Sequence, residues 1–547
     1  MKRFIETYGG ETYDVIVIGG GVTGAAVAYD AASRGLSVAL VEKQDFGCAT
    51  SAATSKLIHG GFRYLANLEF GLVRESLRER RTLENIAPNL VYPIPVLIPC
   101  YKTGITRNKW LVKSGMLLYD LLSYDKGWTW DQSKKIGLHQ TLPREKALEL
   151  EPVIPEDGLE EVFIYQDCAS LFPERLTLAF IKSAVKHGAE VSNYSKVEGF
   201  VFSDGNKNEI TGVKVKDLIN HRDLELRGKL TINCGGPWAD LILGIAKGNY
   251  SARRIRRSEG IHIITRKLVN HNMVVMITPS GKGFFLIPWR GHTLIGTTDK
   301  EYVGNPDEFK VTKQAILELL EIVNGALRGK ERIKYEDILH TYGGLRPLVE
   351  DQTKEVYDSS RRYEIYDNAQ NGLEGLLTVE GGKYTTSRNL AQNVMKMVAN
   401  KMKKNLGNCL TDKQYLAGCE IKDINIFINE LKAEYQDFNE KTVECLGRYY
   451  GNECHQVLEL ARQDKSPSEP LNDDGEIIAQ AAYAIRQEMA LTLKDILFRR
   501  MGIGTLGNPG DEKIFQLADL MAKELNWDEA RKDKEIKEAK KLFKLPE

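Results

Sequence analysis

Residues 13–42 read YDVIVIGGGVTGAAVAYDAASRGLSVALVE, and this stretch decides the fold. It opens on a short apolar run rich in β-branched residues, which is typical of a buried parallel strand. A glycine loop then leads into a helical stretch of small residues, Ala25–Ser33, and into a second apolar strand, Leu36–Val41. The sequence therefore predicts a strand–helix–strand unit of an α/β fold.

The glycine loop has the spacing G-x-G-x-x-G. Gly19 permits the tight turn after the strand, Gly21 lets the backbone approach a pyrophosphate, and Gly24 lets helix and strand pack closely. The N-terminus of the helix adds free N–H groups and a partial positive charge. Glu42 ends the second strand, at close to the roughly 20-residue spacing expected for the acid that binds ribose hydroxyls. The sequence predicts a bound dinucleotide.

Two further apolar strands end in paired glycines far downstream, at Asn233–Gly236 and Glu380–Gly382. A nucleotide domain assembled from distant segments is more typical of flavoproteins, so the sequence favours FAD over NAD. Because glycine permits close backbone approach, we predict that Gly235, Gly381 and Gly382 contact the flavin.

Composition excludes several classes of protein. The 547 residues include 75 basic and 75 acidic side chains, and zero net charge argues against a globally basic, nucleic-acid-binding surface. Eight scattered cysteines without a CxxC pair argue against a zinc site or a disulfide framework and suit a reducing compartment. The chain shows neither a signal-peptide core nor an apolar run of the roughly 20 residues that a spanning helix needs. We expect a soluble or surface-attached cytoplasmic protein without a metal.

Strand signals fade after about residue 395, so the expected fold class is α/β with an additional helical domain. We predict three parts: a discontinuous FAD-binding domain, a substrate-binding or cap domain, and a helical C-terminal domain. The FAD-binding domain takes residues 1–100, 160–250 and 340–395. The substrate-binding or cap domain takes residues 101–159 and 251–339, and the helical domain takes residues 396–547.

Several segments place polar or cationic residues beside glycines or at the end of an apolar run. Ligands of α/β sheets bind at such places. Arginine and lysine there suit a phosphate, which arginine can hold through paired hydrogen bonds. The segments are TSKLIHGGFRYL (54–65), GIH (260–262), GTTD (296–299), YGGLRPL (342–348) and GGKYTTSR (381–388).

In this order, and with GGGVTG, Glu42, NCGGPW (233–238) and LTLKDILFRRMG (491–502), these motifs resemble the FAD-dependent glycerol-3-phosphate dehydrogenases. The match spans most of the chain, and SKLIHGGFRYL is its most discriminating motif. The resemblance implies oxidation of sn-glycerol 3-phosphate to dihydroxyacetone phosphate, with hydride passing from C2 to the flavin N5. Electrons then go to a quinone at the membrane, or to O2 with formation of H2O2 in the oxidase branch.

The same resemblance implies a glutathione-reductase-like Rossmann domain for FAD, an antiparallel-sheet substrate domain and a helical C-terminal domain. It also suggests a homodimer. The remaining cofactor-binding residues that we predict belong to the same motifs and are Thr54, Ser55, Lys56, Leu57 and Thr385.

The reaction needs a base for the C2 hydroxyl and fixed cations for the phosphate. A histidine suits the base because its pKa lies near the operating pH. We favour His59, and His262 is the alternative base or an orienting donor. The candidate cations are Arg63, Arg346 and Lys383, and either of the last two could instead polarise the C2 oxygen. Tyr64 of the same motif is either a substrate contact or a packed aromatic.

Lys109–Asp125 is predicted to be an amphipathic helix. Lys109, Lys113 and Asp120 share one face of it, and Trp110, Leu117 and Leu121 share another. Such a helix either lies at a membrane interface or packs on its own protein. The basic run 253–257 either meets anionic lipid or is a solvated strand face.

Two other functions compete. A FAD-dependent amino-acid oxidase of the glycine-oxidase type would share the N-terminal motif but would not explain the arginine and lysine set. A non-catalytic nucleotide-binding protein would bind FAD that no alcohol reduces. Within the favoured class, the amphipathic helix tilts the prediction towards a quinone-linked, peripheral membrane dehydrogenase.

Overall fold

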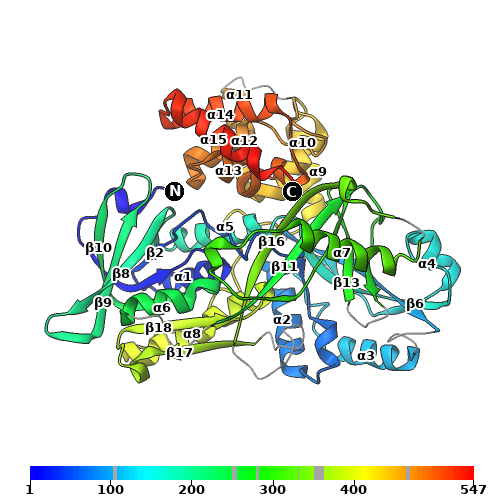
Figure 1. Cartoon of the computed structure of the whole chain (residues 1–547), viewed down its shortest axis with the longest axis horizontal. Coiled ribbons are helices and arrows are strands. Elements are labelled where there is room, and N and C mark those ends of the chain that lie inside the picture. Colours follow the sequence, from blue (N-terminus) through cyan, green and yellow to red (C-terminus); the bar gives the residue numbers. More distant parts are fainter. Residues whose placement is uncertain (103–107, 249–254, 279–282, 330–331, 350–361, 464–468) are drawn as a thin grey trace.

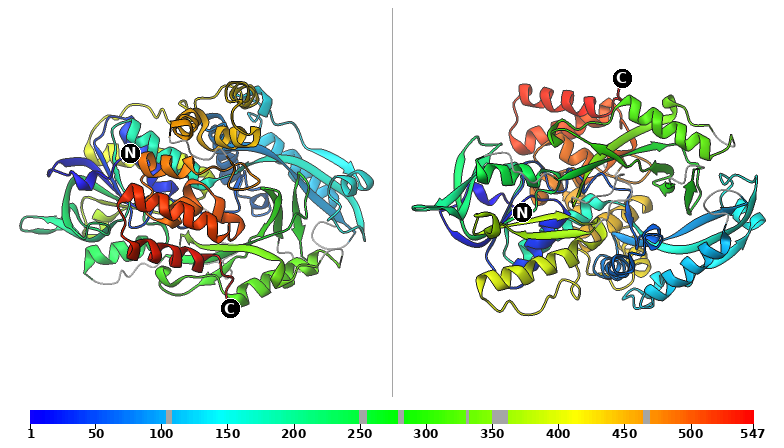
Figure 2. Two further views of the ribbon diagram at one scale, coloured as in Figure 1. Left: turned by 90° about the horizontal axis from the view of Figure 1, so that it is seen from above. Right: turned by 60° about the horizontal axis from the view of Figure 1, so that its bottom comes forward.

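The computed structural model describes residues 1–102, 108–248, 255–278, 283–329, 332–349, 362–463 and 469–547. Two sheets lie side by side, and a group of C-terminal helices packs across their junction (Figure 1). In the two turned views, the C-terminal helices, coloured orange to red, again lie together on one side of the two sheets (Figure 2).

The predicted strand–helix–strand unit is present as β1 (Thr12–Ile18), α1 (Val22–Ser33) and β2 (Val38–Val41). β1 pairs in parallel with β2 on one side and with β10 (Asp223–Asn233) on the other. The alanine-rich helix α1 is buried almost throughout, because small side chains let it pack closely against the sheet and against two further helices. These are α5 (Pro173–Lys186) and α8 (Ser387–Met402).

The first sheet brings together segments that are far apart in the chain. Its order is β17-β18-β10-β1-β2-β7, and β9 and β8 extend it antiparallel from β10. Gly19, Gly235 and Gly381 therefore lie at the carboxyl ends of three neighbouring parallel strands, as the sequence predicted. The remaining strands are β7 (Glu190–Ser192), β8 (Ser195–Ser203), β9 (Asn206–Asp217), β17 (Tyr363–Asp367) and β18 (Leu376–Gly381).

The second sheet is mainly antiparallel, with the order β15-β11-β14-β13-β12-β4-β6-β3; β16 joins it beside β11 and β5 beside β6. α7 (Lys313–Ala326) and α4 (Arg144–Leu150) cover it from one side. Its strands are β3 (Leu57–Ile58), β4 (Val91–Tyr101), β5 (Gln140–Pro143), β6 (Leu159–Ser170), β11 (Arg256–Thr265), β12 (Met273–Ile277), β13 (Gly283–Trp289), β14 (His292–Gly296), β15 (Lys300–Tyr302) and β16 (Ile338–Leu348).

The sheet boundaries differ from the predicted domain limits. β4, most of β6 and most of β16 fall within segments that we predicted for the FAD domain, yet all three are strands of the second sheet. The reason is long-range pairing: β4 pairs with β6 along its full length, and β16 pairs with β11. Local periodicity does not show which distant strand a segment pairs with.

The C-terminal part is helical, as predicted. α8 still belongs to the core of the first sheet, so the separate helical domain begins after Met402. Its helices are α9 (Ile424–Glu434), α10 (Glu440–Tyr450), α11 (Cys454–Gln463), α12 (Ala479–Glu488), α13 (Leu493–Asp495), α14 (Asp511–Leu525) and α15 (Glu529–Leu542).

Candidate active site

A large cavity, of about 2140 Å³, lies between the two sheets. The glycine-rich ends of the first sheet form one wall, and residues of the second sheet form the other. Such a site at the carboxyl ends of parallel strands is where α/β sheets bind ligands. All the sequence motifs that we assigned to substrate or flavin contribute lining residues, whereas no described residue after Thr385 does.

The glycine loop leaves no room for side chains. Gly19 has a left-handed φ of +105°, and a Cβ there would stand 2.6 Å from the carbonyl oxygen of Cys234. A Cβ on Gly24 would stand 1.9 Å from the carbonyl oxygen of Gly19. α1 begins at Val22, whose N–H donates to the Ser51 hydroxyl at 2.9 Å. Gly21, Val22 and Thr23 line the cavity, so the positive end of the helix dipole lies there and favours an anion.

Glu42 organises the loop beside these glycines. Its carboxylate accepts hydrogen bonds from the backbone N–H groups of Gly20, at 2.6 Å, and Gln44, at 2.8 Å. Burial nevertheless raises the pKa of Glu42, so a ligand hydroxyl that donates to it would stabilise its charged form. The glycine loop, the N-terminus of α1 and this acid together fit the pyrophosphate and ribose of FAD.

The first polar cluster surrounds Tyr64. The Lys383 Nζ lies 4.5 Å from the centre of the Tyr64 ring, and the Arg63 guanidinium carbon lies 4.9 Å from it. The Lys383 Nζ is buried and finds no hydrogen-bond partner among the described residues. His59 stands at the end of β3, where its backbone N–H donates to the Thr385 hydroxyl at 3.3 Å. A buried ammonium without an acceptor is a strong candidate to bind an anion.

Burial controls the charge of this cluster. The pKa of His59 is lowered to about 4, mainly by burial; Asp167 opposes this shift, and the positive charges of Lys383 and Arg63 contribute to it. Burial also lowers the pKa of Lys383 from its usual 10.5. At neutral pH the His59 ring is therefore uncharged and able to accept a proton.

The second polar cluster is built on β11 and β16. The His262 Nε2 lies 2.8 Å from the Ser55 hydroxyl, and its ring stacks on Tyr342 with centroids 4.9 Å apart. Its Nδ1 is buried and has no hydrogen-bond partner among the described residues. Burial holds the pKa of His262 well below its usual 6.5, and the charges of Arg346 and Lys56 add to this. His262 is thus a neutral ring held by Tyr342 on one face and by Ser55 at one ring nitrogen.

Arg346 lies next to His262, is oriented by hydrogen bonds and has its Nη1 3.6 Å from the Asp299 carboxylate. Its guanidinium donates to the Thr297 hydroxyl at 2.8 Å, the Thr298 carbonyl at 3.2 Å and the Ser258 hydroxyl at 3.3 Å. A Cβ on Gly260 would stand 2.1 Å from its Nη2. The glycine of the GIH motif therefore makes room for the arginine of the YGGLRPL motif, which explains why both occur in one constellation.

The predicted cofactor contacts at residues 54–57 differ in where their side chains lie. Thr54, Ser55 and Leu57 line the cavity. Lys56 turns away from it and forms a buried ion pair with Glu174 at 2.7 Å. Any contact of Lys56 with the cofactor would therefore come from its backbone.

Asp167 is the site residue that the sequence interpretation missed. It lines the cavity on β6 and accepts hydrogen bonds from the Gly60 backbone N–H at 3.2 Å, from Arg80 at 2.8 Å and from the Tyr119 hydroxyl at 2.8 Å. It therefore holds the turn of the SKLIHGGFRYL motif. The available signal was the Gln-Asp pair at 166–167, which interrupts the apolar stretch that begins at Val162.

Comparison with known families agrees with this geometry. Residues 14–388 match the model described as FAD dependent oxidoreductase, and residues 409–532 match the one described as the C-terminal domain of alpha-glycerophosphate oxidase. The fold and the site thus define a FAD-dependent oxidoreductase, with FAD as its cofactor.

Individual relatives cover nearly the whole chain. A glycerol-3-phosphate dehydrogenase of Synechocystis sp. is 32% identical over 550 residues, covering 98% of this chain and 97% of its own. An aerobic glycerol-3-phosphate dehydrogenase of Bacillus subtilis is 31% identical over 549 residues, covering 97% and 95%. The X-ray structure of the glycerol-3-phosphate dehydrogenase from Bacillus halodurans complexed with FAD superposes with a TM-score of 0.77 at 26% identity, covering 97% and 95%. The chain belongs to the FAD-dependent glycerol-3-phosphate dehydrogenase family.

Proposed function

We propose that the protein oxidises sn-glycerol 3-phosphate to dihydroxyacetone phosphate. The observation that carries this proposal is the buried Lys383 ammonium, which faces the cavity beside Tyr64 and Arg63 without an acceptor among the described residues. Bound FAD supplies a two-electron acceptor for hydride from C2. The residues of the chain bind the phosphate, orient the alcohol and take its proton.

In this proposal Arg346 and Lys383 are the principal cations for the phosphate, and Arg63 adds to the positive field. A phosphate monoester carries nearly two negative charges at neutral pH, and the planar guanidinium of Arg346 can hold it through paired hydrogen bonds. Its preset orientation by Thr297 and Ser258 reduces the entropy lost on binding.

We assign the base to His59. Its ring is neutral at pH 7, because its pKa is about 4, and among the described residues no hydrogen bond occupies it. His262, by contrast, already shares its Nε2 with Ser55 and has its Nδ1 buried. His262 then serves to position Ser55 and the neighbouring wall. The dianionic substrate raises the pKa of His59 on binding, which makes it a stronger base.

Anaerobic addition of glycerol 3-phosphate to the purified holoprotein tests the activity. We expect the visible flavin spectrum to bleach, and we expect glycerol and glycine to leave it oxidised. Bleaching by glycine instead would establish the amino-acid oxidase, and no bleaching by any of the three would favour a non-catalytic protein. Readmitting air and then adding a quinone analogue separates an oxidase from a dehydrogenase.

The alkaline pH dependence should report Lys383. Because burial lowers the pKa of Lys383 below 10.5, its positive charge is present at neutral pH and is lost as the pH rises. We therefore expect kcat/KM to fall on the alkaline side before pH 10.5. Arginine keeps its charge throughout this range, so Lys383→Arg should move that fall to higher pH. An unchanged alkaline profile in Lys383→Arg would remove Lys383 from the phosphate site.

For the electron acceptor we propose a quinone reached at a membrane surface. α3 (Lys109–Leu122) turns Met116 and Tyr119 inward and leaves Trp110, Leu117 and Leu121 between 57% and 69% exposed. Such an unpaired apolar face with tryptophan suits an interfacial helix. None of the helices in the described part of the chain is both long and apolar enough to span a bilayer.

The described residues of the basic run 253–257 do not add to this surface. Arg253 and Arg254 lie outside the described residues. Arg257 is buried and donates to Asp240 and to the Pro237 carbonyl, and Arg256 pairs with Glu301 at 2.9 Å. Arg257 therefore neither meets lipid nor lies on a solvated strand face, the two alternatives that we expected, because the pairing of β11 directs its side chain into the protein.

The triple variant Trp110→Glu, Leu117→Glu and Leu121→Glu should lower sedimentation with anionic phospholipid vesicles by at least about tenfold, because three apolar anchors are lost. The matched control places three glutamates on exposed apolar residues of other helices, Leu317, Ile426 and Phe515. It should sediment like the parent. Equal loss in both variants would show that added charge, rather than α3, decides binding.

A further inference from the structure

The C-terminal motif LTLKDILFRRMG (491–502) belongs to the helical domain. None of the described residues of this domain lines the cavity, whose last lining residue along the chain is Thr385. Two of its arginines nevertheless reach the first sheet. Arg499 and Arg500 are almost fully buried, with side chains 5% and 1% exposed, and both contact Asp45. This contact joins the helical domain to the segment that follows Glu42.

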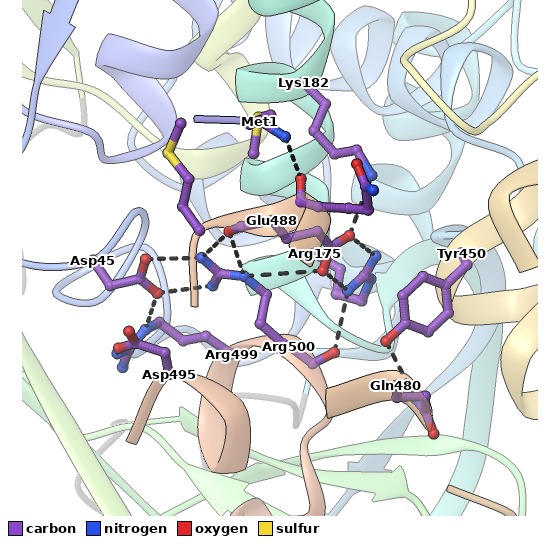
Figure 3. Close-up of polar contacts among 12 residues, drawn as sticks. Met1, Asp45, Arg175, Lys182, Tyr450, Gln480, Glu488, Asp495, Arg499 and Arg500 are labelled. Atoms are coloured by element: carbon purple, nitrogen blue, oxygen red, sulfur yellow. Dashed lines mark hydrogen bonds and ion pairs between the residues drawn. The ribbon is translucent and has the colours of Figure 1, made fainter. Parts of the chain in front are cut away.

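The segment 42–51, here called the cofactor loop, has two faces. Glu42–Gln44 and Gly47–Ser51 line the cavity, whereas Asp45 and Phe46 do not. Phe46 is buried against Gly20, and the Asp45 carboxylate is 0% exposed and points towards the helical domain (Figure 3). The loop therefore presents one face to the cofactor and anchors the other through Asp45.

Both carboxylate oxygens of Asp45 accept hydrogen bonds. Arg500 binds both carboxylate oxygens, each at 2.8 Å, and Arg499 Nε binds Oδ2 at 2.6 Å (Figure 3). Asn193 donates to Oδ1 at 3.0 Å. The pKa of Asp45 is held far below its usual range by the two guanidinium groups. Paired, charge-assisted hydrogen bonds of this kind fix both position and orientation.

The two arginines are themselves held rigidly. They end a π-helical turn, Ile496–Arg500, in which successive side chains diverge less than in an α-helix, so that two neighbours can reach one carboxylate. Arg499 also pairs with Asp495. Arg500 donates to the Glu488 carbonyl at 2.9 Å, and the Glu488 carboxylate pairs with Arg175 of α5 at 2.8 Å. The whole cluster is shown in Figure 3.

Movement of Asp45 would pass directly to the cofactor side of the loop. The Cys48 N–H donates to the Asp45 carbonyl at 3.3 Å, and the Gly47 N–H donates to the Gly20 carbonyl at 2.9 Å. Glu42 holds the backbone N–H groups of Gly20 and Gln44. Asp45 therefore lies three residues after Glu42 and two residues before Gly47, both of which are hydrogen-bonded to Gly20.

We propose that Asp45, Arg499 and Arg500 form a clamp through which the helical domain holds the cofactor loop, so that retention of FAD depends on a domain that lies outside the cofactor cavity. Asp45 is then a positioning residue that acts through Glu42 and the glycine loop. The electron acceptor and the substrate do not enter this proposal. By linkage, FAD should in turn stabilise the docking of the π-helical turn.

The test compares variants of the full-length holoprotein without substrate. Asp45→Asn keeps the shape of the side chain but removes its charge, and Arg500→Lys keeps a charge but loses the paired geometry. We expect Asp45→Asn to raise the dissociation constant of FAD by at least about tenfold, the scale expected when one partner of a buried charge pair is truncated. Arg500→Lys should give a smaller rise. Flavin fluorescence on release measures both.

The matched control is Glu476→Gln. Glu476 is 0% exposed and pairs at 2.9 Å with Arg290, which extends from the second sheet, so this variant weakens docking of the helical domain at a different place. It should lower the melting temperature yet change the FAD dissociation constant less than about twofold. An equal FAD loss in Glu476→Gln and Asp45→Asn would overturn the clamp, because general docking would then explain both.

Amide hydrogen exchange gives a second readout that overall destabilisation does not mimic. In the FAD-free full chain, we expect the amides of residues 42–51 in Asp45→Asn to exchange before those of other parts of the first sheet. Added FAD should slow the exchange of residues 496–500 in the parent, and should slow it less in the variant. If Asp45→Asn fails to fold, Arg500→Lys is measured in the same two assays. Parent-like FAD affinity and parent-like exchange of residues 42–51 in the folded variant refute the proposal.

Discussion

Replacing Arg346 with alanine should raise the KM for glycerol 3-phosphate about a hundredfold, because truncating one partner of a buried, charge-assisted pair costs about 3 kcal/mol. FAD content should stay unchanged, since the guanidinium is held by Thr297, Thr298 and Ser258 rather than by the glycine loop. Steady-state kinetics and the flavin absorbance of the purified variant measure the two effects. A variant that glycerol 3-phosphate saturates like the parent would show that Arg346 does not hold the phosphate.

Gly260→Ala offers a second route to the same residue without touching its charge. The new Cβ would stand 2.1 Å from the Arg346 Nη2, so the guanidinium must shift by about an ångström. We expect KM to rise in this variant also, by less than in Arg346→Ala. Arg346→Lys should fall between the alanine variant and the parent, because lysine retains the charge but not the paired hydrogen bonds.

Replacing His59 with alanine should lower the rate of flavin reduction by roughly 10²–10⁴-fold, which is the usual contribution of a general base. The bound FAD should be retained, because only the backbone N–H of His59 contacts Thr385. Anaerobic stopped-flow absorbance of the flavin gives the rate directly. Added imidazole should restore part of it, since the truncation leaves space beside Lys383 and Arg63.

His262→Ala is the decisive comparison for the His59 prediction. This residue is stacked on Tyr342 and bonded to Ser55, so its loss should alter substrate affinity and local packing more than the chemical step. The reverse outcome, in which His262→Ala stops flavin reduction and His59→Ala does not, would transfer the base to His262.

The parts of the fold that the sequence predicted are those set by local pattern. The glycine loop and its flanking strand and helix follow from short-range periodicity, and the junctions at Gly235 and Gly381 follow from apolar strands that end in glycine pairs. The helical C-terminal domain follows from the loss of strand pattern. β1, α1, β10 and β18 confirm the glycine loop and the two junctions, and helices α9 to α15 confirm the helical C-terminal domain.

What the sequence did not predict depends on contacts between distant residues. Nothing local to β4 or β16 indicates that they pair within the second sheet. Asp167 is recognisable as a site residue only once β6 lies beside Gly60. Arg257 looked like a surface charge because a basic run usually is one, whereas strand pairing buries it against Asp240. The roles of His59, Arg346 and Lys383 remain predictions.

The contact between Asp45 and Arg500 spans 455 residues of the chain, and this separation has a consequence for synthesis. At roughly 5–20 residues per second, Asp45 leaves the ribosome roughly 20 to 90 seconds before its arginine partners. Until the two arginines are synthesised, the Asp45 carboxylate cannot form its ion pairs, and burying an unpaired carboxylate is unfavourable. We therefore expect the segment around Asp45 to stay exposed to solvent in the newly made chain until the last tenth of the chain has been synthesised.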